Sequence, residues 1–337
     1  MKIWYSSYQL VPRSVINSRA KTKFRNGAIL RVRFDDGKTG FSDLCPFAEM
    51  GDRPLERELK DLVGLNPSAI GERSLHFARI DAVARSEERS LFDEDSNRTG
   101  TECLRIKNHF LIHDILRFDL VRVAQLEAAG YTEIKVKMGW DLQAETERLD
   151  QLCARSSHRL RFRLDFNMSL GRERFVYWFE KNQGWLRARV EFFEDPFAYD
   201  HREWREVSER WNIPLALDFA PLQVKLAAEG ASILIVKPAV EDEMQIVRSE
   251  HNQKKKFVVT QYLDFPLGQM AAYYSAQKVA PLLGERLLSC GLQQHDVYQS
   301  PTFQEAIKND GPHIVPPDGH GFGFDRLLES QKWIELS

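Results

Sequence analysis

Six charged side chains stand at or near the ends of short apolar segments that read as buried β-strands. The segments are EIKVKMG, FRLDFN, VEFFEDP, PLALDF and LIVKPA, and they carry Lys135, Lys137, Asp165, Glu194, Asp218 and Lys237. A buried charge is costly unless an opposite charge or a metal ion compensates it. Three acids flanked by lysines therefore indicate a divalent-cation site with basic groups on either side.

The three acids have the chemistry of a magnesium site. Asp165, Glu194 and Asp218 follow one another at intervals of one strand and one helix. Neighbouring strands lie ~4.8 Å apart, so carboxylates from three successive strand ends can converge on one cation. A ligand set made only of oxygen atoms suits Mg²⁺, and the same argument admits Mn²⁺. We therefore expect these three residues to be metal ligands.

The lysines suggest what such a metal would assist. Lys135 and Lys137 are two residues apart on one strand and point to the same side, whereas Lys237 belongs to a later strand on the opposite side. Two adjacent ammonium groups are expected to lower each other's pKa, which would let one lysine act as a general base. The set predicts removal of a proton next to a carboxylate, with a metal and a cation sharing the charge of the enediolate.

The segments between these residues predict the fold that positions them. From LRIKNHFLI to LLSCG, eight apolar strand candidates alternate with helical patterns. The first of these helices is expected to begin at Asp114. Continuous apolar strands separated by amphipathic helices indicate a parallel sheet, and eight units favour a barrel. The expected class is α/β, a modified TIM-like (β/α)8 barrel of (β/α)7β type. Residues at the C-terminal strand ends line the active site of such barrels.

The remainder of the chain predicts a second structural unit. Residues 1–102 read as strands followed by helices, with a hairpin turning at Asp36-Gly37 and a polar boundary over residues 92–101. The tail has no strand–helix rhythm. We expect an α+β capping domain formed by residues 1–102, with residues 300–337 packing back on it, and a barrel domain over residues 103–299.

Composition excludes several classes of partner. The formal net charge of −2 gives no reason to expect nucleic acid or an anionic membrane as a partner. No apolar run approaches the ~20 residues of a membrane helix. The four cysteines, Cys45, Cys103, Cys153 and Cys290, form no CxxC pair and no zinc-site spacing. We expect a cytoplasmic protein that acts on a small molecule, with no protein partner implied.

Taken together, these motifs resemble the enolase superfamily, in its muconate-lactonising-enzyme-like subgroup, and most of all the o-succinylbenzoate synthase family of menaquinone biosynthesis. The similarity covers nearly the whole chain. In the barrel it rests on IKVKMG, RLDFN, FFEDP, ALDFA, IVKPA, VVTQYLDFPLG and CGLQ. In the first hundred residues, AKTKFRNGAILRVRF and DGKTGFSDLCPFAEM resemble the family's mobile substrate loop and second hairpin.

The resemblance implies a role for each matching residue. Lys137 would be the base that removes the proton and the acid that assists departure of hydroxide, and Lys237 the opposing cation near the enediolate. The acids would bind Mg²⁺, with Glu194 rather than Asp195 as the ligand of the EDP motif. The implied substrate contacts are Lys135, Arg163, Thr260 through its hydroxyl and Gly291 through its backbone, and Asn167 matches the family's DxN asparagine.

The resemblance favours a Mg²⁺-dependent dehydratase that forms o-succinylbenzoate, but the chain departs from the family's motifs. Asp218 is followed by Phe219 where the family has DE, the seventh strand reads TQYLDFPLG, and GLD is GLQ. One alternative is transfer of a proton between two faces of a carbon, as in an N-succinylamino-acid racemase. The absence of a DxD pair on the eighth strand disfavours a dipeptide epimerase. A barrel that binds metal or ligand without turnover is a further alternative.

Overall fold

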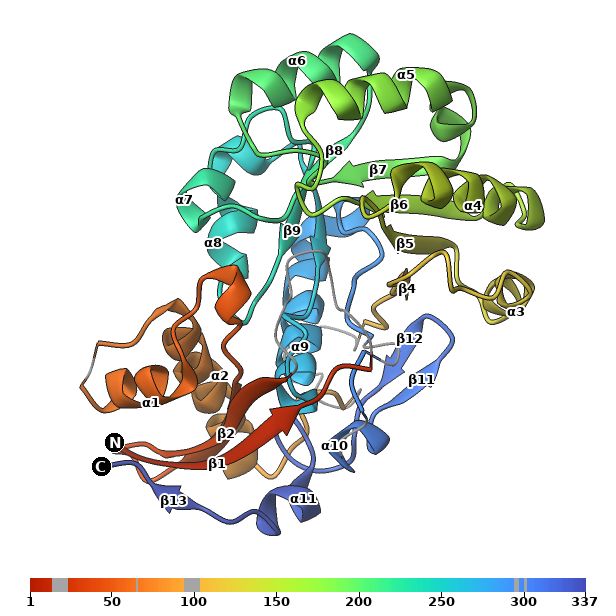
Figure 1. The fold of residues 1–337 in the computed structure, drawn as a ribbon. Coiled ribbons are helices and arrows are strands. Elements are labelled where there is room, and N and C mark those ends of the chain that lie inside the picture. Colours follow the sequence, from red (N-terminus) through yellow and green to blue (C-terminus); the bar gives the residue numbers. More distant parts are fainter. Residues whose placement is uncertain (14–23, 65, 94–103, 294–296, 300–301) are drawn as a thin grey trace.

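A computed structural model describes residues 1–13, 24–64, 66–93, 104–293, 297–299 and 302–337, and Figure 1 shows their arrangement. The predicted boundary between residues 102 and 103 lies outside the described residues, as do residues 20–23 of the proposed loop and Cys103. None of the helices in these ranges is long and apolar enough to cross a membrane.

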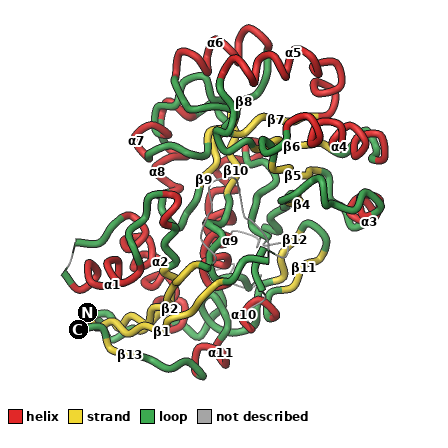
Figure 2. The backbone as a smooth tube through the Cα atoms, viewed as in Figure 1, coloured by secondary structure: helices red, strands yellow, loops and turns green. Residues whose placement is uncertain are grey.

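The largest sheet is parallel, and its strands follow the order β10-β9-β8-β7-β6-β5-β4. The strands are β4 (Phe110–Ile112), β5 (Glu133–Lys137), β6 (Arg161–Asp165), β7 (Val190–Glu194), β8 (Leu215–Leu217), β9 (Ile233–Val236) and β10 (Lys256–Val259). The helices between and after them are α3 (Arg122–Ala128), α4 (Leu142–Arg155), α5 (Arg172–Arg189), α6 (His201–Trp211), α7 (Leu222–Lys225), α8 (Glu243–Arg248) and α9 (Pro266–Leu283). Figure 2 shows the helices outside the curled sheet.

The segment over residues 287–291 closes the sheet. Leu288 donates its backbone N–H to Phe257 of β10, Cys290 donates to Lys107, and His109 donates back to Cys290. The segment therefore lies between β10 and the residues that lead into β4, where the sequence predicted an eighth strand. The expected modified barrel is confirmed.

Side chains alternate between the two faces of the barrel wall. A compact apolar cluster drawn from β7 to β10 fills the interior, and it consists of Phe192, Ala216, Ile233, Ile235 and Val258. The much larger cluster between strands and helices includes Phe162, Leu164 and Trp204. The apolar interior therefore forms a floor, and the polar strand ends lie above it.

The predicted start of one helix is wrong. The helix expected from Asp114 begins only at Arg122. The Asp114 carboxylate accepts from the N–H groups of Leu116 and Arg117, and the Asp119 carboxylate accepts from Val121. Aspartate side chains that satisfy nearby backbone N–H groups compete with helix formation, so two successive turns replace the first helical turns.

The first part of the chain forms an antiparallel sheet of order β13-β1-β2-β3. Its strands are β1 (Lys2–Leu10), β2 (Arg25–Arg33), β3 (Thr39–Leu44) and β13 (Ile334–Glu335), followed after β3 by α1 (Leu55–Val63) and α2 (Ala69–Ser86). β13 pairs with β1, so the last residues of the chain join the first sheet. The remaining elements are α10 (Thr302–Glu305), the hairpin of β11 (Lys308–Asp310) and β12 (His313–Val315), and α11 (Asp325–Glu329).

A buried polar junction connects this sheet to the barrel. Arg25 of β2 donates to the carbonyls of Tyr262, Leu263 and Cys45 at 3.0, 2.6 and 2.7 Å. Asp43 of β3 accepts from the N–H of Phe265 at 3.0 Å. The contacts join the first sheet to the loop that follows β10, and that loop also contains the buried Asp264.

Asp264 should make stability depend on pH. Burial raises its pKa to about 6, although Arg25 opposes the shift. Because the folded-state pKa lies above the unfolded-state value, its stabilising contribution is complete below pH ~4 and is lost as the pH rises through about 6. In the wild type the free energy of unfolding should fall by up to about 3 kcal/mol between pH 4 and 7 because of this group. Asp264→Asn should remove that fall, as measured by urea unfolding. An unchanged decline would contradict the assignment, and the exposed Asp150→Asn is the control.

Candidate active site

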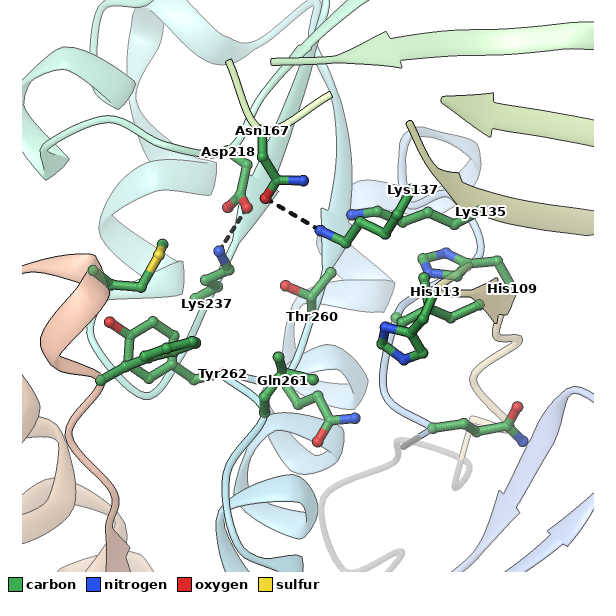
Figure 3. Close-up of a pocket in the computed structure, with 16 residues that line it drawn as sticks. His109, His113, Lys135, Lys137, Asn167, Asp218, Lys237, Thr260, Gln261 and Tyr262 are labelled. Atoms are coloured by element: carbon green, nitrogen blue, oxygen red, sulfur yellow. Dashed lines mark hydrogen bonds and ion pairs between the residues drawn. The ribbon is translucent and has the colours of Figure 1, made fainter. Parts of the chain in front are cut away.

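A pocket opens at the C-terminal ends of the barrel strands, and the predicted lysines face it from two sides (Figure 3). Lys135 and Lys137 enter from β5, and Lys237 enters from the residue after β9. Asp218, Asn167, Thr260 and Gly291 also line the pocket. The structure therefore brings together lysines that are a hundred residues apart in the sequence.

Each predicted acid forms an ion pair with one or two of these lysines. Asp165 Oδ2 lies 2.8 Å from Lys135 Nζ and 2.6 Å from Lys137 Nζ, and Glu194 Oε1 lies 2.7 Å from Lys135 Nζ. Across the pocket, Asp218 Oδ2 lies 2.6 Å from Lys237 Nζ. On each side of the pocket, therefore, the positive charge of the lysines is balanced by the negative charge of the acids.

The acids do not serve as helix caps, which is the commonest structural role of an aspartate after a strand. The helices that follow Asp165 and Asp218 begin later, with Gly171 and Pro221 at their N-cap positions. By contrast, Asp141 and Asp200 do cap α4 and α6, accepting from backbone N–H groups. The structure thus separates the capping aspartates from Asp165 and Asp218, which form ion pairs with the lysines of the site.

Burial and mutual repulsion shift the ionisation of the acids in the site. Burial and the neighbouring Asp165 carboxylate raise the pKa of Glu194 to about 8, and burial with Asp218 and Asp165 raises the pKa of Asp195 to about 7. Lys135 and Lys137 lower the pKa of Asp165 against the effect of its burial. Close carboxylates in a buried site favour an additional cation, because each ionised acid destabilises the next.

The expected lowering of the lysine pKa is wrong for Lys135. Burial would lower its pKa, but Asp165 and Glu194 more than compensate and hold the pKa well above its usual value. The pKa of Lys237 is also raised, chiefly by Asp218, against the effect of burial. Carboxylates, rather than the adjacent ammonium group, dominate the electrostatics of these lysines.

The donor atoms fit a divalent cation. Glu194 Oε2 and Asp218 Oδ1 are buried and have no hydrogen-bond partner among the described residues. An unpaired buried carboxylate oxygen is costly, and a metal ion would satisfy it. Within the described ranges no three acidic, histidine or cysteine side chains already stand in a metal-binding cluster. Lys135 Nζ contacts both Asp165 and Glu194, so metal binding by these acids would require Lys135 to release part of its contact.

Asp195 holds the backbone of the residues that follow β8. Its carboxylate accepts from the N–H groups of Asp218 and Phe219 at 3.1 and 2.8 Å, and its own φ is +41°. The contacts bind the end of β7 to the residues after β8 through the backbone. Asp195 therefore holds the backbone at Asp218 and Phe219 without using the Phe219 side chain.

The predicted substrate contacts are placed differently from one another. Thr260 lines the pocket, and its hydroxyl oxygen is buried without a partner among the described residues. Gly291 also lines it, but its N–H donates to Val259 and its carbonyl accepts from Gln261. The Gly291 N–H is therefore already used in a hydrogen bond within the barrel wall. Gly291 instead leaves space in the pocket.

Arg163 is not among the residues that line the pocket, and its contact with the substrate stays a prediction. It is fully buried in the barrel, where Nε donates to Glu191 Oε2 at 2.7 Å. Its Nη1 lies 2.8 Å from His109 Nδ1, and its guanidinium lies over the Phe192 ring. Alternation predicted that Arg163 points inward with Asp165, and its place two residues earlier on β6 puts it one layer deeper in the barrel.

Several residues that line the pocket were not predicted from the sequence. His109, Leu111 and His113 lie in and beside β4 at a spacing of two, which is the available signal for three side chains on one face. Phe47 and Met50 come from the loop after β3, so the first sheet supplies part of the pocket wall. No local sequence pattern marks these two, because their position depends on how that sheet meets the barrel.

Replacing Gly291 with alanine should impair substrate binding. An added Cβ would lie 2.9 Å from His109 Cε1 and 2.9 Å from Thr260 Cγ2, closer than ordinary van der Waals contact. We expect the KM for the substrate to rise about tenfold and the melting temperature to fall, because the buried His109 and Thr260 side chains must shift to make room. Steady-state kinetics measures the first quantity and thermal unfolding the second. A KM equal to that of the wild type would contradict the close packing.

Comparisons with known proteins agree with the geometry. The model of the o-succinylbenzoate synthase N-terminal domain matches residues 3–84, and that of the enolase C-terminal domain-like family matches residues 119–225. A Bdellovibrio bacteriovorus protein named o-succinylbenzoate synthase is 33% identical over 338 aligned residues, which cover 100% of this chain and 99% of the relative.

Solved structures share the fold at low sequence identity. A dipeptide epimerase from Cytophaga hutchinsonii, complexed with Mg and the dipeptide D-Ala-L-Val, has a TM-score of 0.77 at 14% identity and covers 100% of this chain and 99% of its own. The N-succinyl Arg/Lys racemase from Bacillus cereus has a TM-score of 0.76 at 13% identity, with coverage of 100% and 99%. At these identities the similarity shows a shared fold.

Proposed function

The chain belongs to the enolase superfamily, in its o-succinylbenzoate synthase-like group, and from this premise we propose its reaction. It is a Mg²⁺-dependent lyase that converts 2-succinyl-6-hydroxy-2,4-cyclohexadiene-1-carboxylate into o-succinylbenzoate, in menaquinone biosynthesis. The observation that carries the proposal is the pocket between Lys137 and Lys237, in a chain 33% identical over its whole length to a protein with that name.

In this proposal Lys137 performs both proton transfers. As the neutral amine it removes the proton from the ring carbon that bears the carboxylate, which gives an enediolate. The resulting ammonium group then donates a proton to the departing hydroxyl on the adjacent carbon, so that water leaves and the ring becomes aromatic. One group acting on both positions requires that proton and hydroxyl leave from the same face, which is a syn elimination.

The remaining residues of the site stabilise charge. Lys237 enters from the other side of the pocket as a fixed cation, held by Asp218, and it opposes the negative charge of the enediolate. Asp165, Glu194 and Asp218 would hold Mg²⁺, which when bound neutralises charge on the substrate carboxylate. Mn²⁺ would satisfy the same ligands. Lys135 orders Asp165 and Glu194 and contacts the substrate carboxylate.

The test is turnover of the diene by purified protein. With Mg²⁺ present, we expect the diene absorbance to decay with formation of one equivalent of o-succinylbenzoate, identified by chromatography. No decay above the rate in buffer would overturn the proposal. We place the reaction in the cytoplasm, in keeping with three buried cysteines that are free in the described structure.

A second candidate is racemisation of an N-succinylamino acid. The observation that favours it is that Lys137 and Lys237 line the same pocket from two sides, as exchange of a proton between two faces requires. Incubation of each enantiomer of an N-succinylamino acid in deuterated water distinguishes the reactions. Deuterium incorporation with inversion would show racemase activity, whereas the synthase proposal predicts diene turnover at a far greater kcat/KM.

A barrel that binds metal or ligand without turnover is the third candidate. The two ion-paired lysines facing one pocket count against it, because a binding protein has no need of a base. Calorimetry with Mg²⁺ beside the turnover assay separates the two cases: binding without turnover would favour this candidate.

A further inference from the structure

The proposed reaction assigns no role to the residues in and beside β4 that line the pocket. His109, Leu111 and His113 line the pocket, while Phe110 and Ile112 between them are buried in the barrel wall. His109 is 4% exposed and lies deepest, beside the eighth strand. A buried histidine in a pocket is a candidate for contact with a polar ligand group.

Arg163 determines which nitrogen of His109 carries the proton. The guanidinium Nη1 lies 2.8 Å from His109 Nδ1. An arginine has only donor groups, so Nδ1 must accept, and the neutral imidazole then carries its proton on Nε2. Arg163 is itself fixed by Glu191 and by the carbonyl of Ser289. His109 is therefore held as a hydrogen-bond donor at Nε2.

That nitrogen lies at the space left by Gly291. A Cβ built on Gly291 would lie 3.0 Å from His109 Nε2 and 2.9 Å from Thr260 Cγ2, so both side chains border the same position. Thr260 offers a buried hydroxyl there with no partner among the described residues. The Gly291 N–H is already bonded to Val259, so side chains must supply the donors at this end of the pocket.

We propose that His109 is a specificity-determining residue, which donates from Nε2 to the second carboxylate of a dicarboxylate substrate, beside the Thr260 hydroxyl. Arg163 is a positioning residue that acts through His109. The inference rests on the proposed function, in which that carboxylate is the distal one of the succinyl chain. The cation behind the imidazole favours an anion in front of it, because Arg163 stays charged at every working pH.

The experiment compares two ligands that differ only at the distal group. Binding of o-succinylbenzoate and of 2-butanoylbenzoate, in which a methyl group replaces the distal carboxylate, is measured by calorimetry with Mg²⁺. His109→Leu should weaken binding of o-succinylbenzoate about tenfold or more, the effect of losing a hydrogen bond to a charged group, and leave 2-butanoylbenzoate within about twofold. His109→Gln, which keeps a donor near the same position, should recover part of the loss.

Arg163 is tested through the same ratio of affinities. Arg163→Met should reduce the preference for o-succinylbenzoate, and the double variant with His109→Leu should be no less selective than His109→Leu alone. If His109→Leu weakens both ligands equally, or neither, the inference is overturned while diene turnover by the wild type still supports the proposed function. Wild-type protein that neither binds these ligands nor turns over the diene would overturn both.

Discussion

Replacing Lys137 with alanine is expected to lower kcat for diene dehydration by about 10³–10⁴-fold, the upper part of the range for loss of a general acid–base group. The large effect follows from using one side chain in both proton transfers. Lys137 Nζ is held 2.6 Å from Asp165 Oδ2 and 3.3 Å from Asn167 Oδ1, so it is fixed in place on its side of the pocket. Alanine leaves no group there that could take or return the proton.

The measurement is steady-state turnover of wild type and variant under saturating Mg²⁺. Lys256→Ala is a matched control, because Lys256 is exposed at the start of β10, at the opposite end of the barrel wall. The control should retain wild-type kcat. Affinity of Lys137→Ala for o-succinylbenzoate should change much less than kcat. A variant that kept kcat within tenfold of the wild type would refute the assignment of the base.

The second large effect is expected on removal of a carboxylate that would bind the metal. Glu194→Gln should weaken Mg²⁺ binding at least about a hundredfold, because even residues that only support metal ligands typically contribute ten- to a hundredfold. Glu194 is 1% exposed and its Oε2 has no partner in the described structure, so a neutral amide cannot draw on solvent to replace the lost charge. Turnover should fall in parallel at low Mg²⁺.

Calorimetric titration with Mg²⁺ measures the first effect, and turnover against Mg²⁺ concentration measures the second. Chelation of the metal should abolish wild-type turnover, and added Mg²⁺ should restore it. Glu209→Gln, on the exposed face of α6, should titrate as the wild type does. Unchanged Mg²⁺ affinity in Glu194→Gln would show that the cation, if bound, uses other ligands.

The catalytic lysines and the acids could be predicted because the relevant information is local. Lys135 and Lys137 share a side by the two-residue period of a strand, and each acid ends a segment too apolar to be a surface strand. In a parallel barrel all strand ends meet at one rim, so periodicity alone brings Asp218 to the pocket and Asp165 to the lysines that line it. The same rule placed Lys237 across from Lys137.

What could not be predicted depends on contacts between distant segments. The pocket wall from Phe47 and Met50 needs the packing of the first sheet on the barrel. Whether Arg163 reaches the pocket or supports His109 depends on its contacts with distant segments, such as His109 and Ser289, which strand alternation does not specify. The raised pKa of Lys135 follows from its ion pairs with Asp165 and Glu194, and the sequence placed these acids on neighbouring strands without giving the distances between the charged atoms.

The proposed reaction is tested most directly by counting product. Purified protein, the diene and Mg²⁺ should give o-succinylbenzoate in amounts far above one per protein molecule, with no product above background after chelation or in Lys137→Ala. The opposite result is equally clear. A preparation that binds Mg²⁺ and leaves the diene unchanged, while it inverts an N-succinylamino acid with uptake of solvent deuterium, would show that the same lysines serve proton exchange instead of dehydration.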